Sequence, residues 1–287
     1  MKRQYNKIWL SVIISALALF VSCGNIEENE ILTPLFFGET SQTATITNTE
    51  SRQRVLLEDY TGWKCTNCPT ATEVVNNLLT QYDNLIVMAV HAGGFATPAA
   101  ANDNLDLRTP YGNQWNADFG LTSYPVGVIN RVKENGSVAV SYNDWQTKIE
   151  QRSQREHVLD INLGASVEQN SKIIISCENK FLQSYPSPTL INVLVLENSI
   201  TGLQANGNAT IGATPWIDNY QFNHVLRDNG ITDFPLTANE ARQGDTVKKN
   251  YYIGVKKEWN LSNCHVIVFV TDAATKEVLQ VNEVALH

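Results

Sequence analysis

The sequence has no surplus of positive charge. Among its 287 residues, 21 are Lys or Arg and 29 are Asp or Glu, which gives a formal net charge of -8. Proteins that bind nucleic acid neutralise phosphates with Lys and Arg, so this balance argues against nucleic acid as a partner. Hydrophobic residues make up 43% of the chain and charged residues 17%, a composition that excludes a mainly disordered protein. We find no internal repeat, and the length suits one large domain or two ordinary ones.

Long hydrophobic runs are also scarce. One apolar run of about 14 residues, 8–21, follows a basic start at Lys2, Arg3 and Lys7. A membrane-spanning helix needs about 20 apolar residues, so the run suits the core of a signal peptide (residues 1–22) better than a permanent anchor. The alternative is an uncleaved membrane anchor.

The apolar run ends in Ser22-Cys23-Gly24. A small residue directly before a cysteine resembles the cleavage site of a lipoprotein signal peptidase. The resemblance implies that the Cys23 thiol carries a diacylglycerol and becomes the new N-terminus. Two or three acyl chains would hold the protein stably at a membrane. The alternative is cleavage at another position, with Cys23 discarded.

Residues 23–52 are mostly polar and include an acidic cluster of Glu27, Glu28 and Glu30. Few of them are able to build a core, so the segment predicts a flexible tether between the lipid and the folded part. Acidic residues after a lipidated cysteine resemble the surface-export signals of some Gram-negative lipoproteins. A solvated run of charges is the simpler interpretation.

Strands and helices alternate between residues 53 and 155. Short or unbroken apolar runs predict buried strands, and apolar residues at helical spacing predict helices. The expected elements are strands at 55–57, 85–90, 126–129 and 138–140, helices at 69–82 and 143–152, and a loop with helical insertions at 92–118. A right-handed crossover would make the first two strands parallel. The order is that of an α/β thioredoxin-like domain.

Only strands are predicted from residue 156 to residue 287. The apolar or alternating segments are 159–163, 173–175, 191–196, 251–255, 266–270 and 278–284, with Gly- and Pro-rich turns between them. About seven strands in roughly 130 residues indicate an all-β, immunoglobulin-like sandwich. We therefore predict a second domain over residues 156–287.

The most informative motif is Cys65-Thr66-Asn67-Cys68, between the first strand and the first helix. Unpaired backbone N–H groups at a helix N-terminus favour a thiolate, and Lys64 adds a positive charge. Cys65 would attack a disulfide, and Cys68 would resolve the mixed disulfide. The alternative is a static disulfide between the two cysteines.

A Cys-x-x-Cys motif after an apolar strand resembles the thioredoxin superfamily. The resemblance implies that Asp59 assists proton transfer, with Glu58 as the alternative if the strand register differs. It also implies that Pro125, in Thr122-Ser123-Tyr124-Pro125, is cis and shapes the substrate groove. Trp63 lies two residues before the first cysteine, whereas the superfamily has Trp one residue before, and this position departs from the pattern.

The sequence predicts neither a metal nor a cofactor. A zinc site at the cysteine pair would need two more ligands, and His91 is the one candidate nearby in the pattern. His91 ends a predicted strand, where it either borders the active site or is a hydrogen-bonded histidine at a strand end.

Cys177 and Cys264 fall on strands that we count as the second and sixth of about seven in the predicted sandwich. Immunoglobulin domains join these two strands by a disulfide, and both cysteines share a face with apolar residues. We expect a structural disulfide between them. Two buried free thiols are the alternative.

Several features together resemble one group, the twenty-eight-kilodalton outer-membrane-protein family of Bacteroidota lipoproteins. They are the lipoprotein start, Glu58-Asp59-Tyr60-Thr61-Gly62-Trp63, Tyr124-Pro125 with Asn130-Arg131, and Asn223-His224-Val225-Leu226-Arg227 in the β-rich tail. The resemblance covers nearly the whole mature chain. It implies a lipid-anchored outer-membrane protein, on the periplasmic or the surface side.

Two hypotheses follow for the function. The first is a thiol–disulfide oxidoreductase with Cys65, Cys68, Asp59 and Pro125 at its active site and protein thiols or disulfides as partners. The second is a surface adhesin or ligand-binding protein, in which Cys65 and Cys68 form a permanent disulfide. A fully buried disulfide would favour the second hypothesis.

Overall fold

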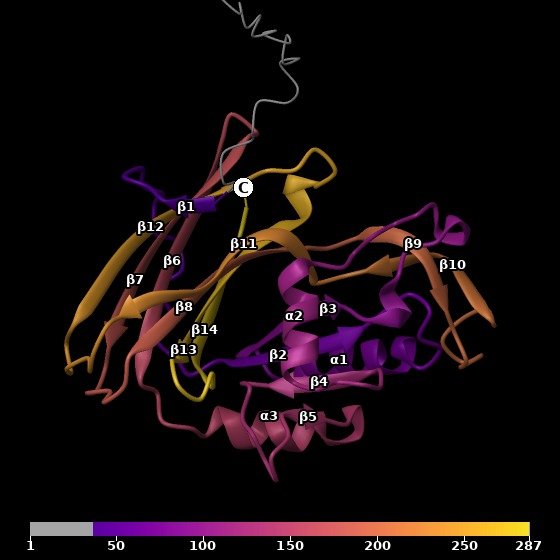
Figure 1. Ribbon diagram of the computed structural model, residues 1–287, viewed down its shortest axis with the longest axis horizontal. Coiled ribbons are helices and arrows are strands. Elements are labelled where there is room, and N and C mark those ends of the chain that lie inside the picture. The colour runs from indigo at the N-terminus through magenta and orange to yellow at the C-terminus, as the bar shows by residue number, and fades with distance from the viewer. Residues whose placement is uncertain (1–36, 287) are drawn as a thin grey trace, which may run out of the picture. The chain divides into compact units, whose positions relative to one another are not determined.

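The computed structural model describes residues 37–286, except for the side chains of Asp228 and Asn229. The predicted signal peptide, the acidic cluster and Cys23 lie outside the described residues. Within the described part, no helix has both the length and the apolar character needed to cross a membrane. The fold is mostly β (Figure 1).

The strands and helices are distributed along the whole described chain. The strands are β1 (Phe37–Glu39), β2 (Val55–Thr61), β3 (Leu85–His91), β4 (Val126–Ile129), β5 (Ala139–Val140), β6 (Leu159–Glu168), β7 (Lys172–Phe181), β8 (Thr189–Glu197), β9 (Ile200–Ala205), β10 (Trp216–Phe222), β11 (Val225–Thr237), β12 (Thr246–Gly254), β13 (Cys264–Asp272) and β14 (Val278–Ala285). The helices are α1 (Cys68–Gln81), α2 (Pro110–Asp118) and α3 (Trp145–Ser153), with short 3-10 turns η2 (Gly94–Ala96), η3 (Ala100–Asn102), η4 (Tyr142–Asp144) and η5 (Leu261–Asn263).

The first half of the chain forms a mixed sheet. β2 and β3 are parallel, β4 pairs antiparallel with β2, and β5 pairs antiparallel with β4. Helices α1 and α3 pack on one face, where Val75 and Trp145 belong to one buried cluster with Val55 and Leu57. Trp115 of α2 belongs to the core on the other face. The strands and helices predicted for residues 53–155 are therefore present, with the first two strands parallel as expected.

Alternation along β2 decides which side chains reach which face. Val55 and Leu57 lie in the core beneath α1 and α3, whereas Leu56 and Tyr60 lie in the core on the opposite face. Because successive side chains of a strand point to opposite faces, Asp59 is on the side of α1. The cysteine pair is at the start of that helix.

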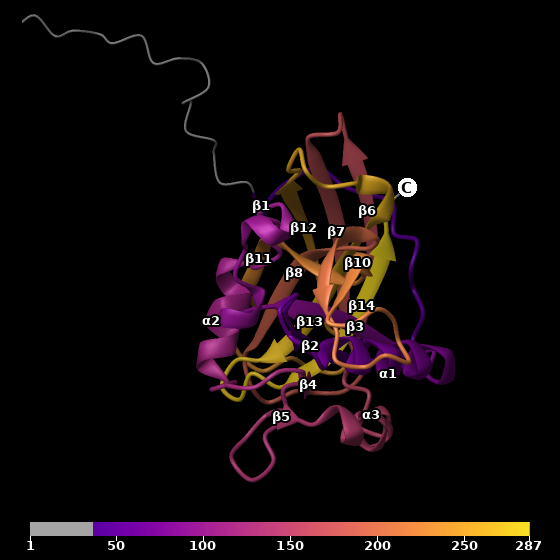
Figure 2. The same cartoon turned by 90° about the vertical axis from the view of Figure 1, so that its right-hand side faces the viewer.

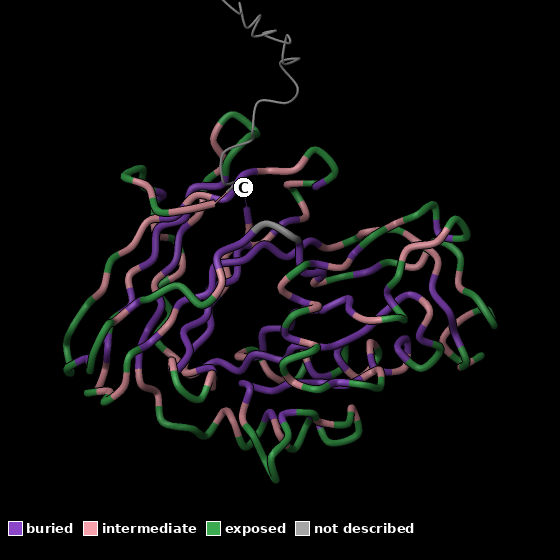
Figure 3. Tube along the Cα trace, in the orientation of Figure 1, coloured by how far each residue is buried: buried purple, intermediate pink, exposed green. Residues whose placement is uncertain are grey.

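The second half of the chain forms a sandwich of two sheets. One sheet has the order β1-β12-β7-β6, and it packs against the β14-β13-β8-β11 part of an eight-stranded sheet. Apolar residues from both sheets fill the space between them, among them Leu163, Ile175, Val193 and Val268. Buried backbone runs through both of these strand layers (Figure 3).

Hydrogen bonding continues across the predicted domain boundary near residue 155. The eight-stranded sheet has the order β14-β13-β8-β11-β3-β2-β4-β5, so it contains strands from both halves. β11 pairs parallel with β3, and the Ala89 amide donates to the His224 carbonyl at 2.8 Å. The described residues accordingly belong to one compact unit, Leu35–His287.

The prediction that residues 23–52 form a flexible tether is wrong from residue 37 onward. From residue 37 onward this segment packs on the sandwich, because β1 pairs with β12 and Asn48 forms a bridge with Leu163. The Ala44 amide also donates to the Ser176 hydroxyl at 2.9 Å. Polar composition suggested a free chain, but the backbone of the segment supplies an edge strand.

The expected disulfide between Cys177 and Cys264 is wrong, because both cysteines are buried free thiols. Cys177 lies in the middle of β7, whereas Cys264 is the first residue of β13. Val255 ends the segment that precedes Cys264 by a short loop, and its amide donates to the carbonyl of Ser171, the residue before β7. The two thiols therefore lie at different levels of the core. They interact instead with the carbonyls of Lys249 and Asn260.

Strands β9, β10 and β11 were not predicted. β9 and β10 form a separate two-stranded sheet that projects from the sandwich over the C-terminal ends of β2 and β3 (Figures 1 and 2). This hairpin carries residues from the second half of the chain to the cysteine pair.

Candidate functional site

Cys65 and Cys68 form a disulfide at the junction of β2 and α1, with their Cα atoms 5.4 Å apart. Cys68 is the first residue of α1, and Pro69 follows it in the first turn, where the missing N–H costs no helical hydrogen bond. Gly62 allows the preceding turn to approach η2 closely, since a Cβ there would lie 2.5 Å from the Phe95 backbone. The Lys64 amide donates to the Phe95 carbonyl at 3.0 Å.

The β9–β10 hairpin covers the cysteine pair. Amides of Ala205 and Gly207 donate to the carbonyls of Trp63 and Thr66, at 2.7 and 2.9 Å. The Gln204 side chain donates to the Cys65 carbonyl at 2.9 Å. As a result, Cys65 and Cys68 are each only 2% exposed.

Aromatic residues hold the hairpin against the turn before the cysteines. The Trp63 and Trp216 rings have centroids 5.9 Å apart, and the Trp63 indole donates to the Thr97 carbonyl at 2.9 Å. Phe222 and Val225 join Trp63 in a small apolar cluster. The Lys64 ammonium lies 5.1 Å from the Trp63 ring centroid.

Asp59 is buried close to Cys68, on the α1 side of β2. Its side chain lines the same small cavity as Cys68, Thr72 and Tyr220, and the cavity volume is about 30 Å³. The Oδ1 atom has no hydrogen-bond partner among the described residues. Burial raises the pKa of Asp59 to about 7, because the surroundings disfavour its charged form. A cavity of this size has room for about one water molecule.

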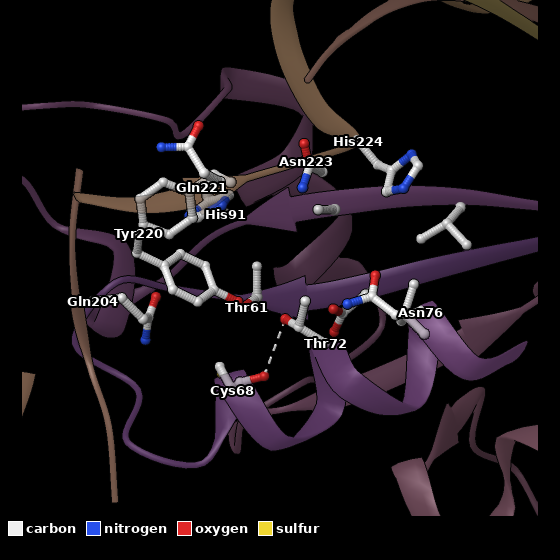
Figure 4. Close-up of a pocket in the computed structure, with 15 residues that line it drawn as sticks. Thr61, Cys68, Thr72, Asn76, His91, Gln204, Tyr220, Gln221, Asn223 and His224 are labelled. Atoms are coloured by element: carbon white, nitrogen blue, oxygen red, sulfur yellow. Dashed lines mark hydrogen bonds between the residues drawn. The ribbon is translucent and has the colours of Figure 1, made fainter. Parts of the chain in front are cut away.

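Figure 4 shows the wall that the hairpin contributes to this cavity. Gln204 and Tyr220 come from the hairpin, and Tyr220 extends toward Thr61 and Thr72. The Thr72 hydroxyl donates back to the Cys68 carbonyl at 3.2 Å. Closure of the cavity therefore depends on both halves of the chain.

Glu58, the alternative proton carrier, lies on the opposite face of β2. Its carboxylate accepts from Arg131 Nε at 2.6 Å and from Arg131 Nη2 at 3.1 Å. Tyr60 also donates to it, at 3.3 Å. The Arg131 guanidinium stacks on Trp115, Phe119 and Phe269. Glu58 is thus a paired residue of the core and does not face the cysteines.

His91 lines the cavity together with His224, a residue that the sequence analysis did not connect with the site. Burial lowers the pKa of His91 to about 3, assisted by the positive charge of Arg227, while Asp106 opposes the shift. Burial also lowers the pKa of His224 to about 4. Both imidazoles are therefore neutral at pH 7. Residues 37–286 contain no group of three or more His, Cys, Asp or Glu arranged to hold a metal ion.

The peptide bond between Tyr124 and Pro125 is cis, as the resemblance implied. Tyr124 lines an open groove of about 620 Å³ beside the cysteine pair, together with Lys64, Phe95 and Leu121. The Phe95 ring is 44% exposed and lies 5.8 Å from the Tyr124 ring. Pro125 itself is not among the residues that line the groove.

Comparison with known proteins gives a family and a fold. HBP35 of Porphyromonas gingivalis has a similar structure, with a TM-score of 0.55 and 16% identity over 83% of this chain and 77% of that chain. A domain of the outer membrane lipoprotein Omp28 from the same organism matches with a TM-score of 0.30 and 18% identity, over 46% of this chain and 91% of that domain. No curated protein matches the sequence. The family model described as "Outer membrane protein Omp28" matches residues 112–287. Since this match covers more than half of the chain, the protein belongs to the Omp28 family and is located at the outer membrane.

Proposed function

We propose that this protein carries out thiol–disulfide exchange on protein substrates at the outer membrane, through Cys65 and Cys68. In the reduced protein, the Cys65 thiolate attacks a substrate disulfide, forms a mixed disulfide and releases one substrate thiolate. Asp59 then accepts the Cys68 proton, and the Cys68 thiolate attacks Cys65 sulfur. This step releases the second substrate thiolate and restores the Cys65–Cys68 disulfide, so two electrons pass from the protein to the substrate.

The observation that carries this proposal is Asp59. A buried carboxyl without a partner lowers stability whenever it ionises, so a purely structural disulfide has no use for one. A proton acceptor for Cys68 needs a pKa near the working pH, and the pKa of Asp59 is about 7. Asp59 and Cys68 line one cavity, which brings the acid to the thiol that must lose a proton.

The arrangement of elements supports the thiolate as well. Cys65 precedes the N-terminus of α1, where backbone N–H groups and the helix dipole favour negative charge. The order β2-α1-β3-α2-β4-β5-α3, with sheet order β3-β2-β4-β5, supports a thioredoxin-like unit over residues 53–155. The two-sheet arrangement of β6–β8 and β11–β14 supports an immunoglobulin-like sandwich over residues 156–287.

We also propose a lipid anchor on Cys23 after removal of residues 1–22.

One observation favours a second candidate function, a surface adhesin or ligand-binding protein with a permanent disulfide. Both cysteines are 2% exposed, and backbone hydrogen bonds tie the hairpin over them. In this case the groove lined by Phe95, Leu121 and Tyr124 would be the contact surface. Asp59 would then have no chemical role.

The reduction potential of the Cys65–Cys68 couple separates the two candidates. Exchange proteins lie between about -270 and -120 mV, and structural disulfides lie below about -300 mV. The companion experiment is a Cys68→Ser variant, which should form covalent adducts with cysteine-containing proteins that dithiothreitol releases. A Cys65→Ser variant is the matched control and should form none. A potential below about -300 mV together with no adducts supports the binding protein instead.

A further inference from the structure

We propose that the β9–β10 hairpin, residues 200–222, is a lid that must lift before any sulfur atom can reach Cys65. The closed position of the lid follows from geometry alone. Its role as a regulator of exchange rests on the function proposed above.

The lid occupies the backbone positions next to the disulfide. Ala205 and Gly207 bond to carbonyls on either side of Cys65, and Gln204 bonds to the Cys65 carbonyl itself. Asn208 reaches Thr70 in α1, at 3.4 Å. These contacts bracket the motif from the turn to the first helical turn.

Thiol–disulfide exchange depends on access of the attacking sulfur to the sulfur under attack. With 2% of each cysteine exposed, the closed lid leaves no such approach for the sulfur of a protein partner. The lid also covers part of the cavity that Asp59 lines, since Gln204, Tyr220 and Phe222 contribute to its wall. Lifting the lid would therefore open the disulfide and hydrate the acid together.

The lid is built so that it can move apart from the rest of the fold. Within residues 37–286, its two strands pair only with each other and join neither of the larger sheets. A two-stranded hairpin is marginally stable by itself, so its position depends on its contacts. Its apolar residues Ile200, Leu203, Tyr220 and Phe222 pack in the small cluster around Trp63, whereas Trp216 remains 40% exposed although it packs on Trp63.

Both ends of the lid have the features of hinges. Ser199 precedes β9 with φ 60°, and His224 follows β10 with φ 57°, a left-handed conformation that is uncommon for residues with a Cβ. The two ends are joined side by side, because the Ser199 amide donates to Asn223 Oδ1 and the His224 amide donates to Asn198 Oδ1. Backbone rotation confined to these paired connections would swing the lid as one piece.

The test is the rate at which dithiothreitol reduces the Cys65–Cys68 disulfide in the full chain, held in detergent micelles. A Gln204→Ala/Trp216→Ala variant loses two lid contacts, and we expect its second-order rate constant to rise roughly tenfold or more over the native chain. Phe234→Ala is the matched control, since Phe234 is a comparably exposed aromatic residue (37%) on β11, outside the lid. The control should be reduced at the native rate.

Equal rates of reduction for the native chain, the lid variant and the control would contradict the lid proposal. Hydrogen exchange of the native chain provides a second test that needs no variant. The Ala205 and Gly207 amides should exchange faster than amides of β8 and β13, because local opening is easier than global unfolding. Exchange of these amides at the rate of the core strands would also overturn the proposal.

These tests are independent of the proposed exchange activity, because dithiothreitol needs neither a protein partner nor Asp59. If the lid variant is reduced faster but the reduction potential is below about -300 mV, the lid shields a structural disulfide. The proposed exchange function would then be wrong, and the lid proposal would stand. If the potential lies in the range of exchange proteins but the variant and the native chain are reduced at the same rate, the proposed function stands and the lid proposal is wrong.

Discussion

Two adjacent acidic residues, Glu58 and Asp59, have opposite environments. Glu58 is fully buried but accepts hydrogen bonds from Arg131 and Tyr60. Asp59 is 5% exposed, and its Oδ1 atom has no partner within the described part of the chain. The alternation of a strand explains the difference, because it sends one side chain toward Arg131 and the next toward α1.

Replacing Asp59 by Asn should stabilise the protein above pH 7. The pKa of Asp59 is raised from 3.8 to about 7 in the folded protein. Its contribution to stability is therefore fully present below about pH 4 and is lost as the pH rises through 7. A shift of about three units corresponds to roughly 4 kcal/mol. Urea unfolding at pH 4, 6 and 8 should show an Asp59→Asn gain that grows across this series. A gain that is the same at all three pH values would mean that Asp59 is not the titrating group.

The two buried thiols give a second prediction at this scale. Burial raises the pKa of Cys177 and of Cys264 to about 12, so both are inert in the folded protein. Thiol titration of a fragment that begins at residue 35 should find two free thiols in urea without reductant. Four thiols are expected after reduction, because Cys65 and Cys68 are then released. A count of zero before reduction would restore the disulfide between Cys177 and Cys264.

At the scale of elements, β1 and the β9–β10 hairpin make structural contacts that their sequences do not predict. β10 is mostly exposed or half-buried along its length, and β1 has three residues, so neither shows a clear apolar alternation. Their positions depend on backbone hydrogen bonds to distant residues. A pattern of side chains along the sequence carries no signal for such contacts.

Removal of residues 37–48 should weaken the fold. This segment supplies three pairings between β1 and β12, and Asn48 Nδ2 donates to Asn282 Oδ1 at 2.9 Å. A fragment that begins at residue 49 is expected to be less stable than one that begins at residue 35 by roughly 2 to 4 kcal/mol. Urea denaturation of both fragments measures the difference. Equal midpoints would show that the segment is only a tether.

The ion pair between β2 and the end of β4 should be sensitive to loss of one partner. Arg131 and Glu58 are both buried, and Arg131 also stacks on Phe269 of β13. Arg131→Met leaves the buried Glu58 carboxylate without its positively charged partner, and the expected cost is roughly 3 to 5 kcal/mol. The double variant Glu58→Gln/Arg131→Met should recover part of this loss. A single variant as stable as the native chain would contradict the burial of the pair.

At the scale of the whole molecule, one eight-stranded sheet joins the two halves of the chain. Its core on the α2 side combines Leu56 and Met88 from the first half with Leu194 and Phe269 from the second. Neither half buries this surface alone. The change of pattern near residue 155 therefore marks a change of architecture without a break in hydrogen bonding.

The shared sheet predicts cooperative unfolding. Far-ultraviolet circular dichroism and tryptophan fluorescence should follow a single transition in urea for a fragment of residues 35–287. A fragment that ends at residue 155 should expose the apolar face of β3 and bind a hydrophobic dye instead of unfolding cooperatively. Two separate transitions, or a protease-resistant fragment that ends near residue 155, would indicate independent domains.

The sequence by itself determined the local elements of this protein. Apolar runs and helical spacing were sufficient for β2, α1 and β3, because these elements bury side chains at regular intervals. The Cys-x-x-Cys motif located the candidate site, and the resemblance to thioredoxins pointed to Asp59 as its acid. Only the tertiary structure decided that Asp59 rather than Glu58 faces the cysteines, that Cys177 and Cys264 stay reduced, and that Gln204 and Tyr220 close the site. These outcomes depend on distances between residues far apart in the chain, and those distances arise when the sheets pack together.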